Sequence, residues 1–218
     1  MSETIVQKFG GTSLGSVERI DAVAEIIKKA SKKNKIAVVV SAMSGETNRL
    51  IDLANSFGNN PDKREFDALV STGETISSAL LSMALHSKGI KARSFSASQI
   101  AIRTTSSYSK AKILDVDAKK ILDVLENDTI PIITGFQGIT EGGDITTLGR
   151  GGSDTTAVAI AAQINANRCD IYTDVDGIFT TDPDIVSNAK KLDSITCLLY
   201  TSDAADEGLG VDLGGRRI

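Results

Sequence analysis

The chain has 218 residues, of which 41% are hydrophobic and 24% charged, and its formal net charge at pH 7 is −4. This composition excludes wholesale disorder, provides apolar side chains for one large α/β domain or two small ones, and lacks the basic stripe of a nucleic-acid-binding protein. The first residues are not a signal peptide and no apolar stretch is long enough to cross a bilayer, so neither a membrane nor a nucleic acid is expected as a partner.

The cysteines and the histidine are too few and too scattered to predict a metal site. Cys169 and Cys197 form no CxxC pair, and His86 is the single histidine. Two distant cysteines favour a reducing compartment, so we expect a cytoplasmic protein with no metal centre built from its own side chains.

Strand and helix alternate from the N-terminus onward. Residues 5–9 predict a short apolar strand, and a helix follows it with Ser16 as its N-cap. Residues 36–40 form a continuous apolar run, which is typical of a parallel strand covered on both faces. A longer helix is expected over residues 63–88, with an interruption near Thr72.

The second half of the chain continues this alternation. Residues 98–112 are rich in hydroxyl groups and predict a hairpin or an irregular loop, and Gly142 and Gly143 predict a hairpin turn. Recurring strand, glycine turn and helix imply an α/β fold, a three-layer α/β/α sandwich with a mainly parallel sheet that binds ligands at the carboxyl ends of its strands. The other expected elements are strands at residues 90–95, 130–134, 145–148 and 170–173, a mixed segment at 112–126, and helices from about residue 46 and up to about residue 165.

The segment KFGGTS, residues 8–13, joins the first strand to the first helix. Its two glycines let successive backbone N–H groups point at one spot, Lys8 adds a positive charge, and Thr12 and Ser13 add hydroxyl donors. The pattern predicts a phosphate-binding turn, and a tight strand–helix turn with a surface lysine stays open as the alternative. No GxxxxGK[ST] motif occurs in the chain, which argues against P-loop chemistry.

A second glycine-rich turn, GRGGSD at residues 149–154, opens an alanine-rich helix. Arg150 can bind a carboxylate through two hydrogen bonds, and Ser153 or Asp154 could simply cap the helix, a role compatible with a catalytic one. Two glycine-rich anion sites in one domain suggest a phosphate donor that faces an anionic acceptor.

Two further motifs carry polar side chains. Glu74 ends STGE, residues 71–74, and is either an exposed surface glutamate or a carboxylate that binds an ammonium group. YTDVDG, residues 172–177, either caps a helix, makes a turn, or binds a ribose or a base edge, and FTTDP, residues 179–183, adds an aromatic face.

Together these motifs resemble those of the aspartokinases of the amino acid kinase family. The resemblance covers about residues 4–195, and the motifs occur in the family's order and spacing. The matching segments are KFGGTS (8–13), VVVSAMSGETN (38–48), REFDALVSTGE (64–74), GFQG (135–138), LGRGGSD (148–154) and YTDVDGIFTTDP (172–183).

The resemblance implies the amino acid kinase, or carbamate kinase-like, fold. It also implies transfer of the γ-phosphoryl group of MgATP to the β-carboxylate of L-aspartate, giving 4-phospho-L-aspartate on the routes to lysine, threonine, methionine and diaminopimelate. ATP and Mg²⁺ are the expected cofactors, and a homo-oligomer is left open. An acceptor carboxylate is already ionised at pH 7, so this reaction needs no general base.

The resemblance also implies roles for single residues. Lys8, Asp154 and Arg150 would be the catalytic residues, with Asp154 orienting Lys8 and Arg150 gripping a substrate carboxylate. Glu74 would bind the substrate ammonium. The substrate would be held by Thr47, Glu74, Arg150 and Ser153. The nucleotide would be held by Lys8, Phe9, Gly10, Gly11, Ser13, Thr173, Asp174, Phe179 and Asp182.

The sequence departs from the family pattern in two places. Asp184 stands where the family usually has Arg or Lys at a phosphate, so Asp184→Arg is expected to tighten ATP binding. The family pattern stops near residue 195, so we expect an incomplete kinase domain over residues 1–196, an artefactual or disordered tail over residues 197–218, and no ACT domains. An inactive fragment that binds only nucleotide, and a family member that acts on another acceptor, stay open as alternatives.

Overall fold

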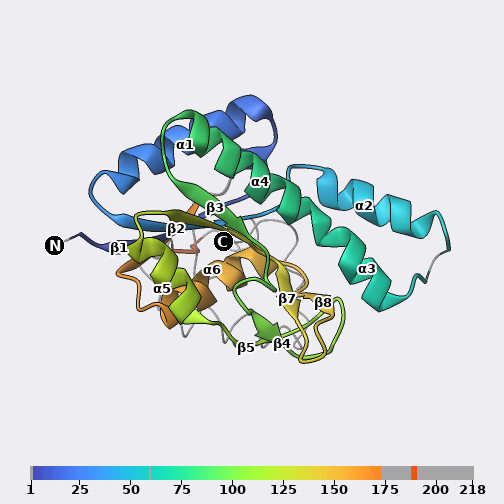
Figure 1. The fold of residues 1–218 in the computed structure, drawn as a ribbon. Helices are drawn as coiled ribbons and strands as arrows, with labels where there is room; N and C mark the ends of the chain where they lie inside the picture. Colours follow the sequence, from blue (N-terminus) through green and yellow to red (C-terminus); the bar gives the residue numbers. More distant parts are fainter. Residues whose placement is uncertain (1, 59, 173–187, 191–218) are drawn as a thin grey trace.

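The computed structural model describes residues 2–58, 60–172 and 188–190, and Figure 1 shows its helices and strands. The first half of the chain contains β1 (Thr4–Phe9), the 3-10 helix η1 (Thr12–Leu14), α1 (Val17–Ser31), β2 (Lys35–Val40), α2 (Glu46–Asn55), α3 (Lys63–Val70), α4 (Thr72–Ser87) and β3 (Ala92–Phe95). The second half contains β4 (Arg103–Thr104), β5 (Ile113–Asp115), α5 (Ala118–Glu126), β6 (Ile130–Thr134), β7 (Gln137–Ile139), β8 (Ile145–Thr147), α6 (Gly152–Gln163) and β9 (Arg168–Tyr172).

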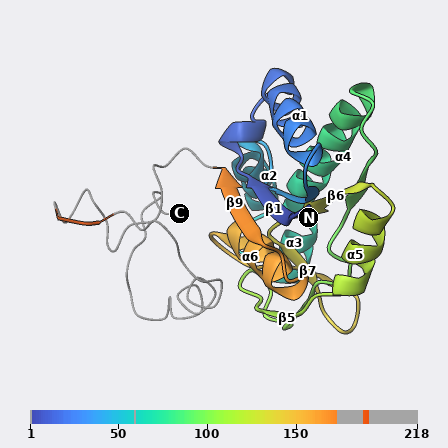
Figure 2. The same ribbon diagram turned by 90° about the vertical axis from the view of Figure 1, so that its left-hand side faces the viewer.

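Five parallel strands form the main sheet in the order β3-β6-β2-β1-β9. Lys8 on β1 is level with Val39 on β2 and Ile171 on β9. β9 lies at one edge of this sheet, as Figure 2 shows. Because the strands run in one direction, their carboxyl ends lie at the same edge, which is where a parallel α/β sheet binds its ligands.

Two apolar cores lie on opposite faces of the main sheet. One core joins β1 and β2 to α1 and α4 and includes Ile5 and Ile27. The other joins the opposite faces of the same strands to α5 and α6 and includes Val6 and Ile160. Figure 1 shows α1 and α4 on one side of the sheet and α5 and α6 on the other. The three-layer α/β/α sandwich with a mainly parallel sheet is therefore confirmed.

Local signals in the sequence set two helix boundaries. The hydroxyl of Ser16 accepts a hydrogen bond from Arg19 N–H at 3.3 Å, so the predicted N-cap of α1 is confirmed. The expected interruption near Thr72 is also confirmed, because α3 ends at Val70 and α4 begins at Thr72, with Ser71 at the joint.

A second, smaller sheet has the order β5-β4-β7-β8. The predicted hairpin is confirmed, since β7 and β8 pair antiparallel and Gly143 between them has a φ of +86°. Residues 98–112, left open as a hairpin or a loop, contain the short strand β4, which pairs antiparallel with β5.

α3 and α4 together form one long and largely apolar helical run. By length and composition alone Lys63–Ser87 could cross a membrane, although no apolar stretch of that length was expected from the sequence. Half of its most apolar window is buried inside the fold, and its buried side chains include Asp67 and Glu74. A core helix of a globular domain accounts for this pattern.

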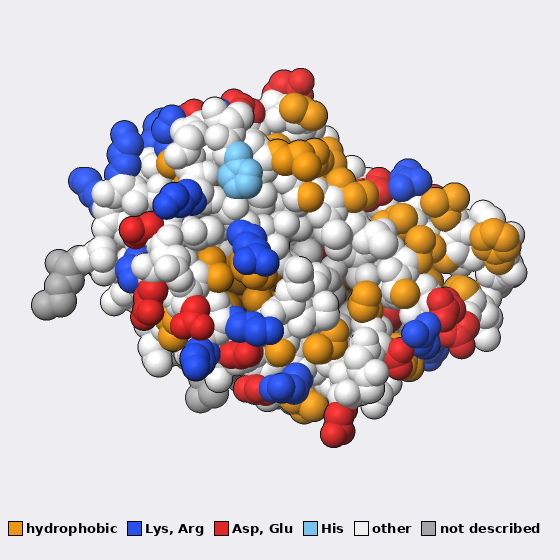
Figure 3. All heavy atoms as spheres, in the orientation of Figure 1, with side chains coloured by type: hydrophobic (Ala, Val, Ile, Leu, Met, Phe, Trp, Pro, Cys, Tyr) orange, Lys and Arg blue, Asp and Glu red, His pale blue; other side chains and the backbone are white. Residues whose placement is uncertain are grey.

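Apolar side chains also gather on one outer face of the molecule. Figure 3 shows this face, with apolar groups over α4 and α2. The exposed large hydrophobic residues of these helices are Leu53, Ile76 and Met83, and Phe57 follows the end of α2 with 96% of its surface exposed.

Candidate active site

A cavity of about 370 Å³ opens at the carboxyl ends of the central strands. The segments that follow β1, β2 and β6 meet there with the first turns of α4 and α6. The cavity therefore lies at the edge of the sheet where the strand order predicts a ligand site.

Lys8 brings a positive charge into this cavity from β1. Its Nζ lies 2.7 Å from Oδ1 of Asp154 on α6, and only 6% of Lys8 and 8% of Asp154 is exposed. The contact is an ion pair rather than an aligned hydrogen bond, and Oδ1 accepts no hydrogen bond from the other described residues. Because burial reduces screening by water, the pair holds the ammonium group in one place.

The turn after β1 is built from close backbone contacts. Gly10 N–H donates to the Tyr172 carbonyl at 3.1 Å, and the Gly11 carbonyl accepts from Ser44 N–H at 3.1 Å. A Cβ on Gly11 would lie 2.8 Å from the Ala42 carbonyl oxygen, so the packing requires glycine at this position. The predicted set of successive N–H groups aimed at one anion is wrong at Gly10, because its N–H extends the pairing of β1 with β9.

Glu74 is a carboxylate buried in the wall of the cavity, with 3% of its surface exposed. Its Oε1 accepts a hydrogen bond from Ala42 N–H at 3.1 Å, and its Oε2 has no hydrogen-bond partner among the described residues. Burial raises the pKa of Glu74 to about 7, although hydrogen bonds from backbone N–H groups act to lower it. The alternative of an exposed surface glutamate is therefore wrong, and a cationic ligand group would satisfy Oε2.

The second glycine turn connects β8 to α6. Gly149 and Gly151 have φ values of +84° and +70°, which side chains disfavour. The N-cap of α6 is Gly151, with no capping hydrogen bond from a side chain. The capping alternative for Ser153 and Asp154 is therefore excluded, because both residues lie inside the first turn and Asp154 faces Lys8.

The structure brings together part of the predicted site. The predicted residues that line the cavity are Lys8, Gly11, Thr47, Glu74, Ser153 and Asp154. Arg150 lies between the lining residues Gly149 and Gly151, and its side chain is exposed.

Other predicted nucleotide contacts do not line this cavity. The ring of Phe9 is fully buried and stacks on Tyr172, with ring centroids 4.5 Å apart. Gly10 is committed to the sheet, and Ser13 lies half-buried in η1. The residues Thr173, Asp174, Phe179, Asp182 and Asp184 lie outside the described residues.

Several residues that line the cavity had no predicted role in the site. Residues 41–45 follow β2 and form one wall, and Phe136 follows β6. The signal for residues 41–45 was present, because the buried strand predicted at residues 36–40 ends in small residues at the same edge as Lys8. Little in the sequence indicated that Phe136 would line the cavity. Its backbone adopts a φ of +66°, a conformation that phenylalanine rarely takes and that its residue type does not predict.

The sequence model of the amino acid kinase family matches residues 3–210. The chain belongs to the amino acid kinase family. Its relatives include the aspartate kinase of Pseudomonas putida, which is 55% identical over 193 residues, or 88% of this chain and 47% of that protein. The aspartokinase of Geobacillus stearothermophilus is 54% identical over 193 residues, with the same two shares. The solved structure of Escherichia coli aspartokinase III in complex with aspartate and ADP matches with a TM-score of 0.77 at 30% identity, over 88% of this chain and 54% of that chain.

The chain spans about half the length of the curated relatives it matches. The match to the family runs to residue 210, whereas the alignments to these two relatives cover 193 residues. The boundary between a kinase domain at 1–196 and a tail at 197–218 stays a prediction, because the described residues beyond 172 are 188–190.

Proposed function

We propose that this chain carries the phosphoryl-transfer site of an aspartate kinase, which moves the γ-phosphoryl group of MgATP to the β-carboxylate of L-aspartate. The observation that carries the proposal is the buried carboxylate of Glu74, whose Oε2 lacks a partner among the described residues, in the same cavity as the Lys8 ammonium. A ligand set with one ammonium group and several anionic groups would satisfy both charges. The 55% identity to an aspartate kinase supports aspartate as that ligand.

On the donor side, Lys8 would contact the phosphoryl group and offset the charge of the transferring oxygens. Asp154 would keep the ammonium of Lys8 in position through their ion pair of 2.7 Å. Phosphoryl transfer depends mainly on positioning and on charge stabilisation, so a preorganised cation is the group that this reaction needs.

On the acceptor side, Glu74 would bind the ammonium group of aspartate and the hydroxyls of Thr47 and Ser153 would contact its polar groups. Arg150 would grip a carboxylate of the substrate with its planar guanidinium. The acceptor carboxylate is itself the nucleophile and is ionised at neutral pH, so no side chain has to remove a proton from it.

Mg²⁺ would enter this site with ATP. Within residues 2–58, 60–172 and 188–190, no three His, Cys, Asp or Glu side chains cluster as metal ligands, which fits an ion held by phosphate oxygens. When bound, it would offset the negative charge of the phosphates. Thr173, Asp174, Phe179 and Asp182 are proposed to complete the nucleotide pocket on the strength of the family resemblance alone.

The wider role follows from the proposed reaction. We propose that the product serves the synthesis of lysine, threonine, methionine and diaminopimelate in the cytoplasm, without nucleic-acid or membrane partners. The exposed apolar residues Ile76 and Met83 on α4 would suit a contact between subunits of a homo-oligomer.

A coupled assay of ADP release with MgATP and L-aspartate tests the proposal. Turnover with L-aspartate but not with L-glutamate, lost in Glu74→Ala, is the expected result. Because the chain spans about half of its relatives, a fragment that only binds nucleotide is the second candidate. ATP binding without ADP release would establish that candidate instead, and turnover with glutamate alone would overturn the choice of substrate.

A further inference from the structure

Asp67 is a buried carboxylate on α3 that holds three segments of the chain together. It has no exposed surface, and its Oδ2 accepts hydrogen bonds at 2.8 Å from the backbone N–H groups of both Ser109 and Thr147. Its Oδ1 accepts from the hydroxyls of the same two residues, at 3.0 Å and 2.9 Å respectively. Four donors thus satisfy one carboxylate that water does not reach.

The bonds to Thr147 fix the start of one cavity wall. Thr147 is the last residue of β8, and the lining residue Gly149 follows two positions later. Between them, Leu148 N–H donates to the Phe136 carbonyl at 2.9 Å. The turn that carries Ser153 and Asp154 therefore begins at a residue whose N–H and hydroxyl are both bound by Asp67.

The bonds to Ser109 support the same wall at a second point. Ser109 has a φ of +66°, a conformation that costs energy for a residue with a side chain. Its carbonyl oxygen lies 3.4 Å from the place where a Cβ on Gly149 would be. Asp67 thus holds a strained residue in contact with the glycine turn.

The helix of Asp67 also leads into the opposite wall. α3 joins α4 at Ser71, and the Ser71 carbonyl accepts a hydrogen bond from Gln137 Nε2 at 2.7 Å. Glu74 follows in the first turn of α4. The backbone between Asp67 and Glu74 is therefore helical except at Ser71, whose carbonyl is hydrogen-bonded to Gln137 on β7.

We propose that Asp67 is a positioning residue that fixes the separation between the Glu74 wall and the Gly149–Asp154 wall of the cavity. Under the proposed function, on which the catalytic part of this inference rests, that separation sets the distance between the acceptor carboxylate and the phosphoryl group. A misplacement of about 1 Å in such a site can lower the rate by about a hundredfold.

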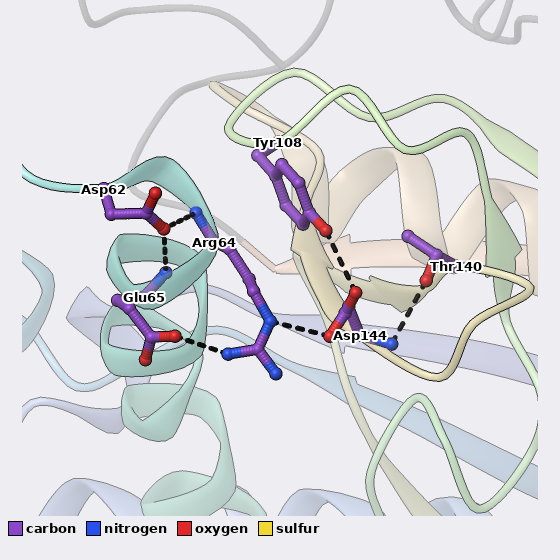
Figure 4. A network of polar contacts seen from close by, with 6 residues as sticks. All are labelled: Asp62, Arg64, Glu65, Tyr108, Thr140 and Asp144. Carbon is purple, nitrogen blue, oxygen red and sulfur yellow. Dashed lines mark hydrogen bonds and ion pairs between the residues drawn. The ribbon is translucent and has the colours of Figure 1, made fainter.

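A second link between the same regions provides a control. Figure 4 shows a partly exposed network in which Arg64 at the start of α3 contacts Glu65 and Asp144. Asp144 Oδ1 lies 2.7 Å from Arg64 Nε, and Tyr108 donates to Oδ2 at 3.1 Å. Asp144 does not line the cavity, and exposed pairs of this kind contribute little to stability.

Asp67→Ala, Asp67→Asn and Asp144→Ala separate a positioning role from simple packing. Alanine removes both acceptor oxygens. Asparagine has the same shape: its oxygen can accept from the two backbone N–H groups, while its amide donates to the two hydroxyls, which can turn to accept.

Hydrogen exchange monitored by mass spectrometry needs no turnover. We expect Asp67→Ala to speed amide exchange at residues 109–111 and 147–152, and Asp67→Asn and Asp144→Ala to leave both segments near wild type. Unchanged exchange in Asp67→Ala, or an equal increase in Asp144→Ala, overturns the proposal. If Asp67→Ala does not fold, Thr147→Val provides a second test, because it removes one hydroxyl donor to Asp67. Thr147→Val should then give a smaller increase in exchange in the same two segments. Exchange unchanged from wild type in Thr147→Val would also overturn the proposal.

Kinetics test the catalytic consequence. Asp67→Ala should lower kcat by roughly tenfold to a hundredfold with a much smaller change in KM for either substrate, and Asp67→Asn should restore kcat. A fall in stability with kcat preserved in the folded fraction would reduce Asp67 to a packing residue. If the wild-type chain shows no turnover at all, the proposed function fails while the exchange experiment still decides the positioning role.

Discussion

The Lys8 ammonium lies 2.7 Å from Oδ1 of Asp154, and the two side chains reach each other from β1 and α6. Both are buried, so either charge left alone would lose water without gaining a partner. An anionic ligand in the cavity can therefore approach a cation whose position is already fixed.

Removal of Asp154 should destabilise the fold because it leaves Lys8 buried and unpaired. We expect Asp154→Ala to lower the free energy of unfolding by about 3 kcal/mol, measured by urea denaturation at pH 7. The double variant Lys8→Met with Asp154→Leu should recover most of this loss. A double variant as unstable as Asp154→Ala would show that the loss comes from packing rather than from the lone charge.

Removal of Lys8 should abolish catalysis in a chain that still folds, although its melting temperature should fall because Asp154 is left buried and unpaired. Under the proposed function, Lys8→Ala is expected to lower kcat by about a hundredfold or more, since the charge that develops on the phosphoryl oxygens loses its partner. The coupled ADP assay and a thermal melt give the two measurements. Lys119→Ala, an exposed lysine on α5, is the matched control and should keep full activity.

Ionisation of Glu74 should make the stability of the ligand-free chain depend on pH. Burial raises its pKa to about 7 in the folded chain, from an ordinary value of 4.5. The folded chain then binds more protons than the unfolded chain between these values, so stability falls as the pH rises through this window. The loss is complete above about pH 8 and amounts to roughly 3 kcal/mol.

Glu74→Gln cannot ionise and should lack this component of the pH dependence. Urea denaturation at pH 5 and pH 8 for both chains measures the difference. An equal difference in unfolding free energy between pH 5 and pH 8 for the wild type and Glu74→Gln would contradict the prediction. Under the proposed function, added L-aspartate should also reduce the wild-type loss at pH 8, because its ammonium group favours the ionised carboxylate.

A methyl group at Gly11 should disturb the cavity, whereas one at Gly10 should not. The added Cβ would lie 2.8 Å from the Ala42 carbonyl in Gly11→Ala but 3.4 Å from the Tyr172 carbonyl in Gly10→Ala. We expect Gly11→Ala to lower the midpoint of urea unfolding by an amount equivalent to about 1–3 kcal/mol. Equal midpoints for the two variants would show that residues 41–45 can move away at no cost.

The fold was largely predictable because its signals are local. The apolar run at residues 36–40 and the hairpin glycines Gly142 and Gly143 each specify their element through side-chain pattern or backbone freedom. The N-cap of α6 was not predictable from such signals. Aspartate is a common capping residue. In this chain, however, the carboxylate of Asp154 pairs with the buried ammonium of Lys8, the fifth residue of β1, and faces the cavity.

The charged residues of the site could be predicted from the sequence, but which of them contact each other and which are buried could not. Lys8 and Asp154 lie far apart in the sequence, and the parallel strand order is what brings them together. The burial of Glu74 depends on the contact of its helix with the segment after β2, which no local pattern near residue 74 reveals.

Ala42 touches three parts of the site through three different groups. Its carbonyl oxygen faces Gly11, its N–H binds Glu74, and its Cβ lies 2.8 Å from the place where a Cβ on Gly73 would be. Substitutions at positions 11, 42 and 73 are consequently not independent. A methyl group gained at Gly73 should be tolerated when Ala42 is replaced by glycine. As the sequence diverges, a larger side chain at one of these positions is therefore expected to be accompanied by a smaller one at another.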